Sequence, residues 1–300
     1  MKYIFIGIVI IIILIILIIN KNNSVENFEE NEDETACKYV SSHGIKKLCN
    51  TVENCIYVKA NELDKFTIPE YNFVLVTGNE DTTIPEDFKE KSNEILNSPN
   101  LIHWYSQNLN DLTHLKLSSI PIGLDYHTIG EGNPEMAWWG QQQTPKKQEE
   151  LIFELNKVPY DQREIKLYIN FANSIRGKYG EKDRKEALEQ IPKHLQVVEE
   201  NKVPRKESWK HMAQYAFVVS PLGNGLDCHR TWETLVLGCI PVVKTSSLDI
   251  LYKDLPVLIV KNWYDINEEL LKNTIGEFKN KTFNYDKLTL EYWKNIISNN

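Results

Sequence analysis

The sequence lacks an excess of basic residues. It contains 34 Lys and Arg residues against 42 Asp and Glu residues, which gives a formal net charge of −8 at pH 7. A surface of this charge repels nucleic-acid phosphates, and no basic stripe interleaved with aromatic residues offsets it. We therefore expect no nucleic-acid partner.

Cysteine is also scarce, with five residues in a chain of 300. Such a low content excludes a small disulfide-rich scaffold. Cys37, Cys49 and Cys55 are close in the chain, and one pair of them can close a short loop in an oxidising compartment, with the pairing left open. Cys228 and Cys239, if they share a helix, lie roughly 16 Å apart, beyond the approximately 7 Å Cα separation of a disulfide. We expect these two to be buried thiols.

Motifs for metals and common cofactors are missing. The seven histidines occur singly, without the Cys and His spacing of a metal site. The glycines at 223 and 225 lack the third glycine of a dinucleotide fingerprint, and no Gly-Lys-Ser/Thr sequence follows them as in a phosphate-binding P-loop. The sequence therefore predicts neither a bound metal nor a cofactor.

The N-terminus contains a long apolar run. Residues 3–19 carry no charge, consist almost entirely of Ile, Leu and Val, and would span roughly 25 Å as a helix. They predict a single transmembrane anchor at residues 1–20. The alternative is a cleavable signal peptide, whose apolar region is usually shorter and ends in small residues. We expect a short cytosolic tail, with the rest of the chain in a lumen.

Residues 21–36 follow this run and include six acidic residues between Glu26 and Glu34. Their composition predicts a solvated acidic stem. The remainder of the chain belongs to a folded protein, since 42% of all residues are hydrophobic and 25% are charged.

The second half alternates β-prone runs with helical segments every twenty to thirty residues, roughly the spacing of a parallel sheet with right-handed crossovers. We expect helices at 181–191 and 206–215. The expected strands are 167–172, 195–198, 216–220, 240–243 and 256–260. These elements predict a Rossmann-like domain at 161–262, and two amphipathic helices fit residues 263–300.

The first half predicts a second α/β domain at residues 37–160. Its expected elements are strands at 71–77, 101–105 and 120–122, a helix at 111–117 and another at 148–155. A loop at 131–147, broken by Gly and Pro, separates the last two. Trp138 and Trp139 within this loop either close over a ligand or dock the loop onto the domain.

One junction carries the strongest sign of a binding site. In "SPLGNGLDCHRTWETLVLGCIPVV", residues 220–243, a strand ends and a helix begins near Asp227. The turn between them contains Gly223, Asn224 and Gly225, which permit positive φ and a close approach of backbone N–H groups to an anion. Because ligands bind at the carboxyl edge of open α/β sheets, we expect this turn and Asp227 to line a pocket.

The helix that follows adds two charged residues to this junction. Arg230, in its first turn, can neutralise a phosphate together with the helix N-terminus, and Glu233 can accept hydrogen bonds from sugar or ribose hydroxyls. The alternative is an ordinary surface ion pair between Arg230 and Glu233.

Two further segments contribute candidates. "NSIRGKYGEKDR", residues 173–184, is a glycine-broken cationic loop after a strand, and its Arg176 and Lys178 are expected at the same sheet edge; a solvated turn is the alternative. Asp125 and His127, in "PIGLDYHT", are candidates for a catalytic base, with a purely structural role as the alternative.

The stretch 220–243, together with "SSLDILYKDLPVLIV" after it, resembles the carboxy-terminal half of exostosin-like glycosyltransferases over residues 165–262. The resemblance implies a GT-B architecture, with two Rossmann-like domains around a cleft behind one membrane anchor, and a Golgi location. It also implies an inverting, metal-independent transfer from a nucleotide sugar, such as a UDP-sugar, to a glycan or glycoprotein. In that family Arg230 would contact the diphosphate and Glu233 the ribose or uridine side.

The soluble part is short for this architecture, so the acceptor cannot be transferred from the family. Two other functions stay open. A Golgi-type sulfotransferase shares the membrane anchor and an anion site, although "VTGNED" at 76–81 carries acidic residues where that class needs cations. An inactive relative that binds glycans or acts as a scaffold is the other.

Overall fold

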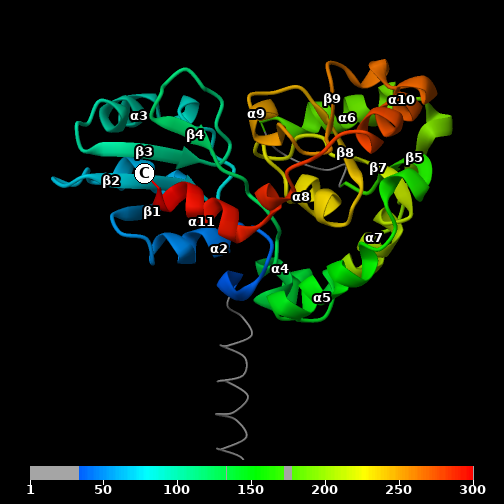
Figure 1. Ribbon diagram of the computed structural model, residues 1–300, viewed down its shortest axis with the longest axis horizontal. Helices are drawn as coiled ribbons and strands as arrows, with labels where there is room; N and C mark the ends of the chain where they lie inside the picture. Colours follow the sequence, from blue (N-terminus) through cyan, green and yellow to red (C-terminus); the bar gives the residue numbers. More distant parts are fainter. Residues whose placement is uncertain (1–33, 133, 172–177, 300) are drawn as a thin grey trace, which may run out of the picture.

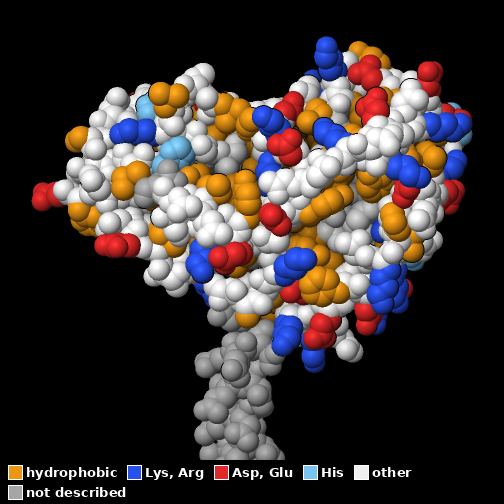
Figure 2. Space-filling model, in the orientation of Figure 1, with side chains coloured by type: hydrophobic (Ala, Val, Ile, Leu, Met, Phe, Trp, Pro, Cys, Tyr) orange, Lys and Arg blue, Asp and Glu red, His pale blue; other side chains and the backbone are white. Residues whose placement is uncertain are grey.

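The computed structural model describes residues 34–132, 134–171 and 178–299, and it shows two parallel β-sheets with helices around them (Figure 1). This is the predicted α/β class, and it is compatible with two Rossmann-like domains. Figure 2 shows the molecule as two lobes with a hollow between them.

The first sheet has four strands in the sequential order β1-β2-β3-β4. β2 is buried along its whole length, as its apolar sequence FVLVTG predicts. Helices α2 (Ser42–Cys49) and α3 (Lys89–Leu96) belong to this half. The strands are β1 (Cys55–Lys59), β2 (Phe73–Gly78), β3 (Leu101–Ser106) and β4 (Leu117–Ser119).

Two expectations for this half are wrong. The last strand is at Leu117–Ser119 and not at 120–122, and residues 111–116 are not helical. The Asp111 carboxylate accepts a hydrogen bond from Thr113 N at 2.9 Å, a local turn that competes with helix formation. The sequence also missed β1, whose half-buried residues lack the alternation of a typical strand.

The second sheet has five strands in the order β6-β5-β7-β8-β9. Because β5 lies between β6 and β7, the strand order reverses there, as in other doubly wound folds that bind ligands at this point. The strands are β5 (Glu164–Ile169), β6 (Gln196–Val198), β7 (Tyr215–Val219), β8 (Ile240–Lys244) and β9 (Leu258–Val260), and the longer connecting helices are α6 (Gly180–Gln190), α7 (Arg205–Met212) and α8 (His229–Val236).

The remaining helices are short or lie near the ends of the described chain. α5 packs against α7, so it lies beside the second half although the sequence assigned it to the first domain. The α-helices are α4 (His127–Gly130), α5 (Pro145–Leu155), α9 (Asp249–Tyr252), α10 (Glu268–Lys279) and α11 (Leu290–Ser298), and the 3-10 helices used below are η1 (Glu34–Ala36), η4 (Pro134–Trp139) and η7 (Trp263–Asp265).

The two predicted C-terminal helices are present, but they pack against different halves of the structure. Leu271 of α10 belongs to the core of the second sheet, whereas α11 packs against α2 in the first half (Figure 1). Trp293 and Ile297 of α11 are buried. The C-terminal helix α11 therefore forms part of the first half of the structure.

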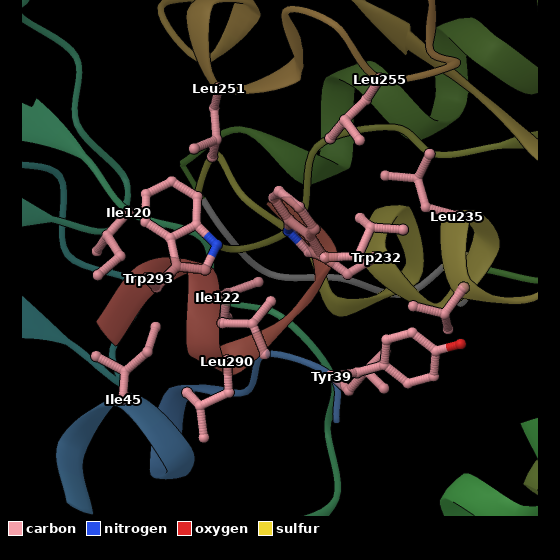
Figure 3. Packing of buried hydrophobic residues seen from close by; sticks show 14 of the residues in the cluster. Tyr39, Ile45, Ile120, Ile122, Trp232, Leu235, Leu251, Leu255, Leu290 and Trp293 are labelled. Carbon is pink, nitrogen blue, oxygen red and sulfur yellow. The ribbon is translucent and has the colours of Figure 1, made fainter. Parts of the chain in front are cut away.

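A hydrophobic core joins the two halves. It combines Ile120 and Ile122, which follow β4, with Trp232 and Leu235 of α8 and Trp293 of α11 (Figure 3). All of these side chains are buried. The relative position of the sheets is thus fixed by shared apolar packing.

The cysteine expectations can now be resolved. Cys49 and Cys55 form a disulfide across six residues of sequence separation, and Cys37 is buried and belongs to no disulfide. Cys228 and Cys239 are free, as predicted; Cys239 is buried and Cys228 is partly buried.

The predicted anchor at residues 1–20 and most of the predicted stem lie outside the described residues. Within the ranges that are described, no helix has both the length and the apolar character needed to cross a bilayer. Glu34 departs from the expectation of a solvated stem up to residue 36, because only 4% of its surface is exposed. The folded part of the chain therefore includes Glu34.

Candidate functional site

Arg230 lies at the point where the strand order of the second sheet reverses. Its Nη1 donates a hydrogen bond to Oδ1 of Asn170, the residue directly after β5. The Asn170 amide is oriented by its own Nδ2, which donates to Ser208 Oγ at 2.6 Å. Since α8 begins after the loop that leaves β7, the Arg230 guanidinium lies at the carboxyl edge between β5 and β7. This is the edge that the sequence predicted for it.

A second guanidinium accompanies Arg230. The Cζ atoms of Arg184, on α6, and of Arg230 lie 5.6 Å and 5.8 Å from the centre of the same Phe171 ring. Burial and the neighbouring Arg230 charge lower the pKa of Arg184 to about 10, and burial also lowers the pKa of Arg230, against the opposing effect of Glu233. Two cations that are partly removed from water and repel each other form a site that an anion stabilises.

The loop after β7 is held against α6. The Arg184 Nε atom donates to Leu222 O at 3.1 Å, and Leu222 N donates to Asp183 Oδ2 at 2.9 Å. The backbone of this loop is therefore fixed before any ligand arrives.

The glycine turn differs from the expectation. Neither Gly223 nor Gly225 has a positive φ, and Gly223 N donates to Gly225 O at 3.1 Å. A Cβ on Gly225 would lie 2.7 Å from Asn108 Oδ1, and Asn108 belongs to the first half. Gly225 is thus required by close packing between the halves. Gly223 lies instead beside Arg184, since a Cβ there would be 3.5 Å from Arg184 Nη2, and Asn224 is exposed.

Asp227 also serves the contact between the halves. Its Oδ2 accepts from Ile122 N at 2.8 Å, and its Oδ1 accepts from Trp232 Nε1 at 2.9 Å and from Cys228 N at 2.9 Å. Burial raises the pKa of Asp227 to about 6, against the effect of these donors. These three bonds occupy the carboxylate that the sequence placed in the binding pocket.

The segment that carries the candidate base is held by residues of the second half. Gly123 has φ +67° and approaches the Val40 backbone so closely that only glycine fits. Its carbonyl oxygen accepts a hydrogen bond from His229 Nδ1 at 2.7 Å. This conformation places Asp125 and His127, just after it, at the interface with α7 and α8.

Asp125 and His127 lie in direct contact. His127 Nδ1 is 3.1 Å from Asp125 Oδ1, and Arg205 Nη2 is 2.7 Å from Asp125 Oδ2. Burial alone would raise the pKa of Asp125, but Arg205, His229 and His127 outweigh this and hold it well below its usual value. Burial lowers the pKa of His127, although Asp125 opposes this. The pair therefore consists of a carboxylate and a neutral imidazole at pH 7.

Arg205 connects this pair to α8. Its Nη2 lies 3.8 Å from Glu233 Oε1, and its Nη1 donates to Gln148 Oε1 at 2.9 Å. Glu233 is 8% exposed and Arg205 is 2% exposed. An exposed Arg230–Glu233 surface pair is therefore excluded, because Glu233 is buried beside Arg205, although its charge also acts on the pKa of Arg230.

A cavity of about 420 Å³ adjoins His127 and is also lined by Glu34, His43, Lys47 and Tyr126. Burial raises the pKa of Glu34 to about 7, against a hydrogen bond from Ser41, and burial with the His127 charge lowers the pKa of His43 to about 4. The His43 and His127 rings are 4.4 Å apart. The cavity thus combines groups whose proton affinities are shifted in opposite directions, as in acid–base sites.

The cationic loop contributes less than expected. Arg176 lies outside the described residues. Lys178 Nζ is 3.0 Å from Glu86 Oε2 and 3.1 Å from Asp87 Oδ1, so its charge is paired with acidic residues of the first half.

Two arginines of the site were missed in the sequence. Arg184 lies in register with the buried Ala187 and Ile191, and Arg205 with the buried Trp209. These spacings of three, four and seven residues mark the inward face of a helix. An arginine at helical spacing from apolar residues indicates a buried cation, and this pattern could have identified Arg184 and Arg205 from the sequence.

In the parts of the chain that are described, no group of three or more His, Cys, Asp or Glu side chains is arranged to hold a metal ion. The chain matches no protein-family model and no curated protein sequence.

Proposed function

We propose that this protein is a membrane-anchored, exostosin-like glycosyltransferase of GT-B type. It moves a sugar from a nucleotide diphosphate sugar, with a UDP-sugar expected, to a glycan or glycoprotein acceptor with inversion. The observation that carries the proposal is the pair of guanidiniums of Arg184 and Arg230 over Phe171, at the carboxyl edge where the strand order reverses.

The pair suits a diphosphate for an electrostatic reason. Breaking a sugar–phosphate bond builds negative charge on the leaving diphosphate, and fixed cations in a partly dehydrated site stabilise that charge without reorganising. Arg230 is already oriented by Asn170, and Glu233, three residues further along α8, is the proposed acceptor of hydrogen bonds from ribose hydroxyls. The transfer then needs no metal, as the family resemblance implies.

In this proposal, His127, held by Asp125, is the general base that takes the proton of the acceptor hydroxyl. The Asp125 carboxylate favours the tautomer with the proton on His127 Nδ1, which leaves Nε2 to take a proton. The acceptor oxygen attacks the anomeric carbon, its proton passes to His127, and the bond to the diphosphate breaks. The cavity of about 420 Å³ beside His127 has room for the acceptor sugar.

The test is nucleotide binding to the full chain, measured by calorimetry. We expect UDP to bind, and Arg230→Ala or Arg184→Ala to weaken it about 10- to 100-fold, since hydrogen bonds to charged groups contribute about 1.5–3 kcal/mol. Lys182→Ala is the matched control, because Lys182 is on the same helix as Arg184 and 86% of its side chain is exposed. It should leave UDP affinity unchanged.

A panel of UDP- and GDP-sugars then tests turnover, which His127→Ala should abolish without loss of UDP binding. A folded chain that binds none of these nucleotides contradicts the proposal. Preference for adenosine 3′,5′-bisphosphate over UDP would instead indicate a sulfotransferase. Glycan binding without donor turnover, unaffected by Arg230→Ala, would indicate an inactive relative.

A further inference from the structure

A second cavity, also of about 420 Å³, lies between the loop around η4 and the start of α7. The indoles of Trp138, Trp139 and Trp209 line it, together with the amide side chains of Gln141 and Gln143. Trp139 and Trp209 also support Arg205, whose Cζ lies 5.3 Å and 5.4 Å from their ring centres. This contact accounts for these two indoles but not for Trp138, whose exposed ring therefore needs its own explanation.

Trp138 and Trp139 are held in place while part of their surface stays accessible. The two rings are 5.2 Å apart and inclined at 54°. Lys202 Nζ lies 4.9 Å from the Trp138 ring centre, and Arg205 Cζ lies 5.3 Å from that of Trp139. Trp138 is nevertheless 43% exposed. A large apolar ring kept partly in water by a fixed support is suited to a ligand that covers it.

The lining favours a hydroxyl-rich ligand. A pyranose ring has apolar C–H faces that can cover an indole, and its hydroxyls both donate and accept hydrogen bonds, as Gln amides do. Of the charged residues in the wall, Arg205 is already paired with Asp125 and Glu233, and Glu207 accepts a hydrogen bond from Lys210 at 2.9 Å, whereas Lys206 adds a cation. The indoles and the amides, and not the charges, therefore identify the ligand class.

The cavity also adjoins the proposed base. Arg205 forms part of its wall and holds Asp125, which contacts His127. Ile129 in the same wall is two residues from His127. Gly130 and Gln142 line the cavity beside His127, and their sequence neighbours Ile129, Gln141 and Gln143 line this one, so the same two segments contribute to both walls.

We propose that this cavity is a subsite for the acceptor, and that the acceptor is an oligosaccharide whose units stack on Trp138. This inference rests on the proposed function, because it names the substrate class of the same transferase. It assigns to the tryptophan loop the role of holding the acceptor chain.

The test is calorimetric titration of the full chain, in a detergent without a sugar headgroup, with maltotriose, cellotriose, xylotriose and triacetylchitotriose. We expect at least one trisaccharide to bind. Trp138→Ala should weaken that binding about tenfold, and Trp138→Phe by much less, because a phenyl ring keeps an apolar face. Tyr264→Ala is the matched control: Tyr264 is an exposed aromatic residue, 64% accessible, in η7. It should have no effect.

Two results would overturn the assignment: absence of binding for all four trisaccharides, or equal binding by Trp138→Ala. A third would assign the loop to a lipid surface, since tryptophan also prefers membrane interfaces. To test this, the tryptophan fluorescence of the protein is measured in vesicles of brominated phosphatidylcholine, whose bromine atoms quench tryptophan. Stronger quenching in the wild type than in Trp138→Phe would show that Trp138 contacts lipid. UDP titration of the same samples separates the hypotheses. UDP binding without trisaccharide binding removes only the subsite, whereas trisaccharide binding without nucleotide binding removes the transferase.

Discussion

The two sheets of this protein are both parallel, yet they differ in where chemistry can gather. In the first sheet the strands follow one another in sequential order, and in the second the order reverses between β5 and β7. Where the order reverses, neighbouring loops diverge and leave a crevice at the carboxyl edge. Arg184, Arg230 and Asn170 meet there. The first half instead contributes Asp125 and His127, from a segment that the second half holds in place.

The halves also differ in how they are stabilised. The first half takes α11 from the far end of the chain and carries the Cys49–Cys55 disulfide. One apolar cluster of the second half lies wholly between β5 and α10, whereas its other buried residues belong to the core shared with the first half. Stability of the first half and ligand binding by the second should therefore respond to different substitutions.

The largest effect expected is that of Trp293→Ala. Trp293 is 5% exposed in the core that joins α11 to both halves, and truncation of a buried Trp costs about 3–5 kcal/mol. The free energy of unfolding from urea titration should fall by about this amount, while UDP affinity of the folded protein stays unchanged. Tyr264→Ala, at an exposed site, serves as the control. If Trp293→Ala lost UDP binding but kept its free energy of unfolding, the separation between stability of the first half and ligand binding by the second half would be wrong.

The disulfide should have a smaller effect. Cys49 and Cys55 are six residues apart, and closure of so short a loop stabilises the folded state by about 2 kcal/mol in the chain-entropy model. The double variant Cys49→Ser/Cys55→Ser should therefore have a free energy of unfolding about 2 kcal/mol lower, and its urea midpoint should fall accordingly. Dithiothreitol should shift the wild type to the same midpoint and leave the variant unaffected. A dithiothreitol shift in the variant would show that another group is responsible.

The smallest effect concerns pH and Glu34. Burial raises its pKa to about 7, so between its usual value and pH 7 the folded state binds a proton that the unfolded state has lost. The free energy of unfolding should therefore fall as pH rises through this window and level off above pH 7. Between pH 5 and pH 8 the wild type should lose roughly 1–2 kcal/mol more than Glu34→Gln.

Urea midpoints at the two pH values measure this difference. The pKa of His43 is lowered and acts in the opposite direction between pH 4 and 6.5. Because His43 Nδ1 lies 3.7 Å from Glu34 Oε1, the same comparison is also made in a His43→Gln background. Identical pH dependence of wild type and variant would mean that Glu34 is ionised in the folded state.

Local patterns identified most elements of the second half. On α8, Trp232, Leu235 and Val236 are buried, as their helical spacing in the sequence indicates. The opposite side of α8 carries the polar residues Glu233 and Thr234, and these are buried too. The reason is that α8 lies between two domains, and periodicity within one helix does not report a second neighbour.

The candidate site was predicted unevenly for the same reason. Arg230 was correctly expected at the sheet edge, since strand direction and helix register fix it. Gly225, Asp227 and Lys178 were expected to face a ligand, but they contact the first half of the chain. The residues that decide these contacts, such as Asn108 and Ile122, are more than 100 positions away from their partners.

The sequence by itself determined the alternation of strands and helices, the parallel sheet and the place of Arg230, because these follow from side-chain spacing within a few residues. Tertiary structure alone decided that Asp125, Arg205 and Glu233 form one connected group, that α11 returns to the first half, and that Arg184 joins Arg230. These outcomes depend on which distant surfaces bury each other, and the free energy of that burial comes from the whole core.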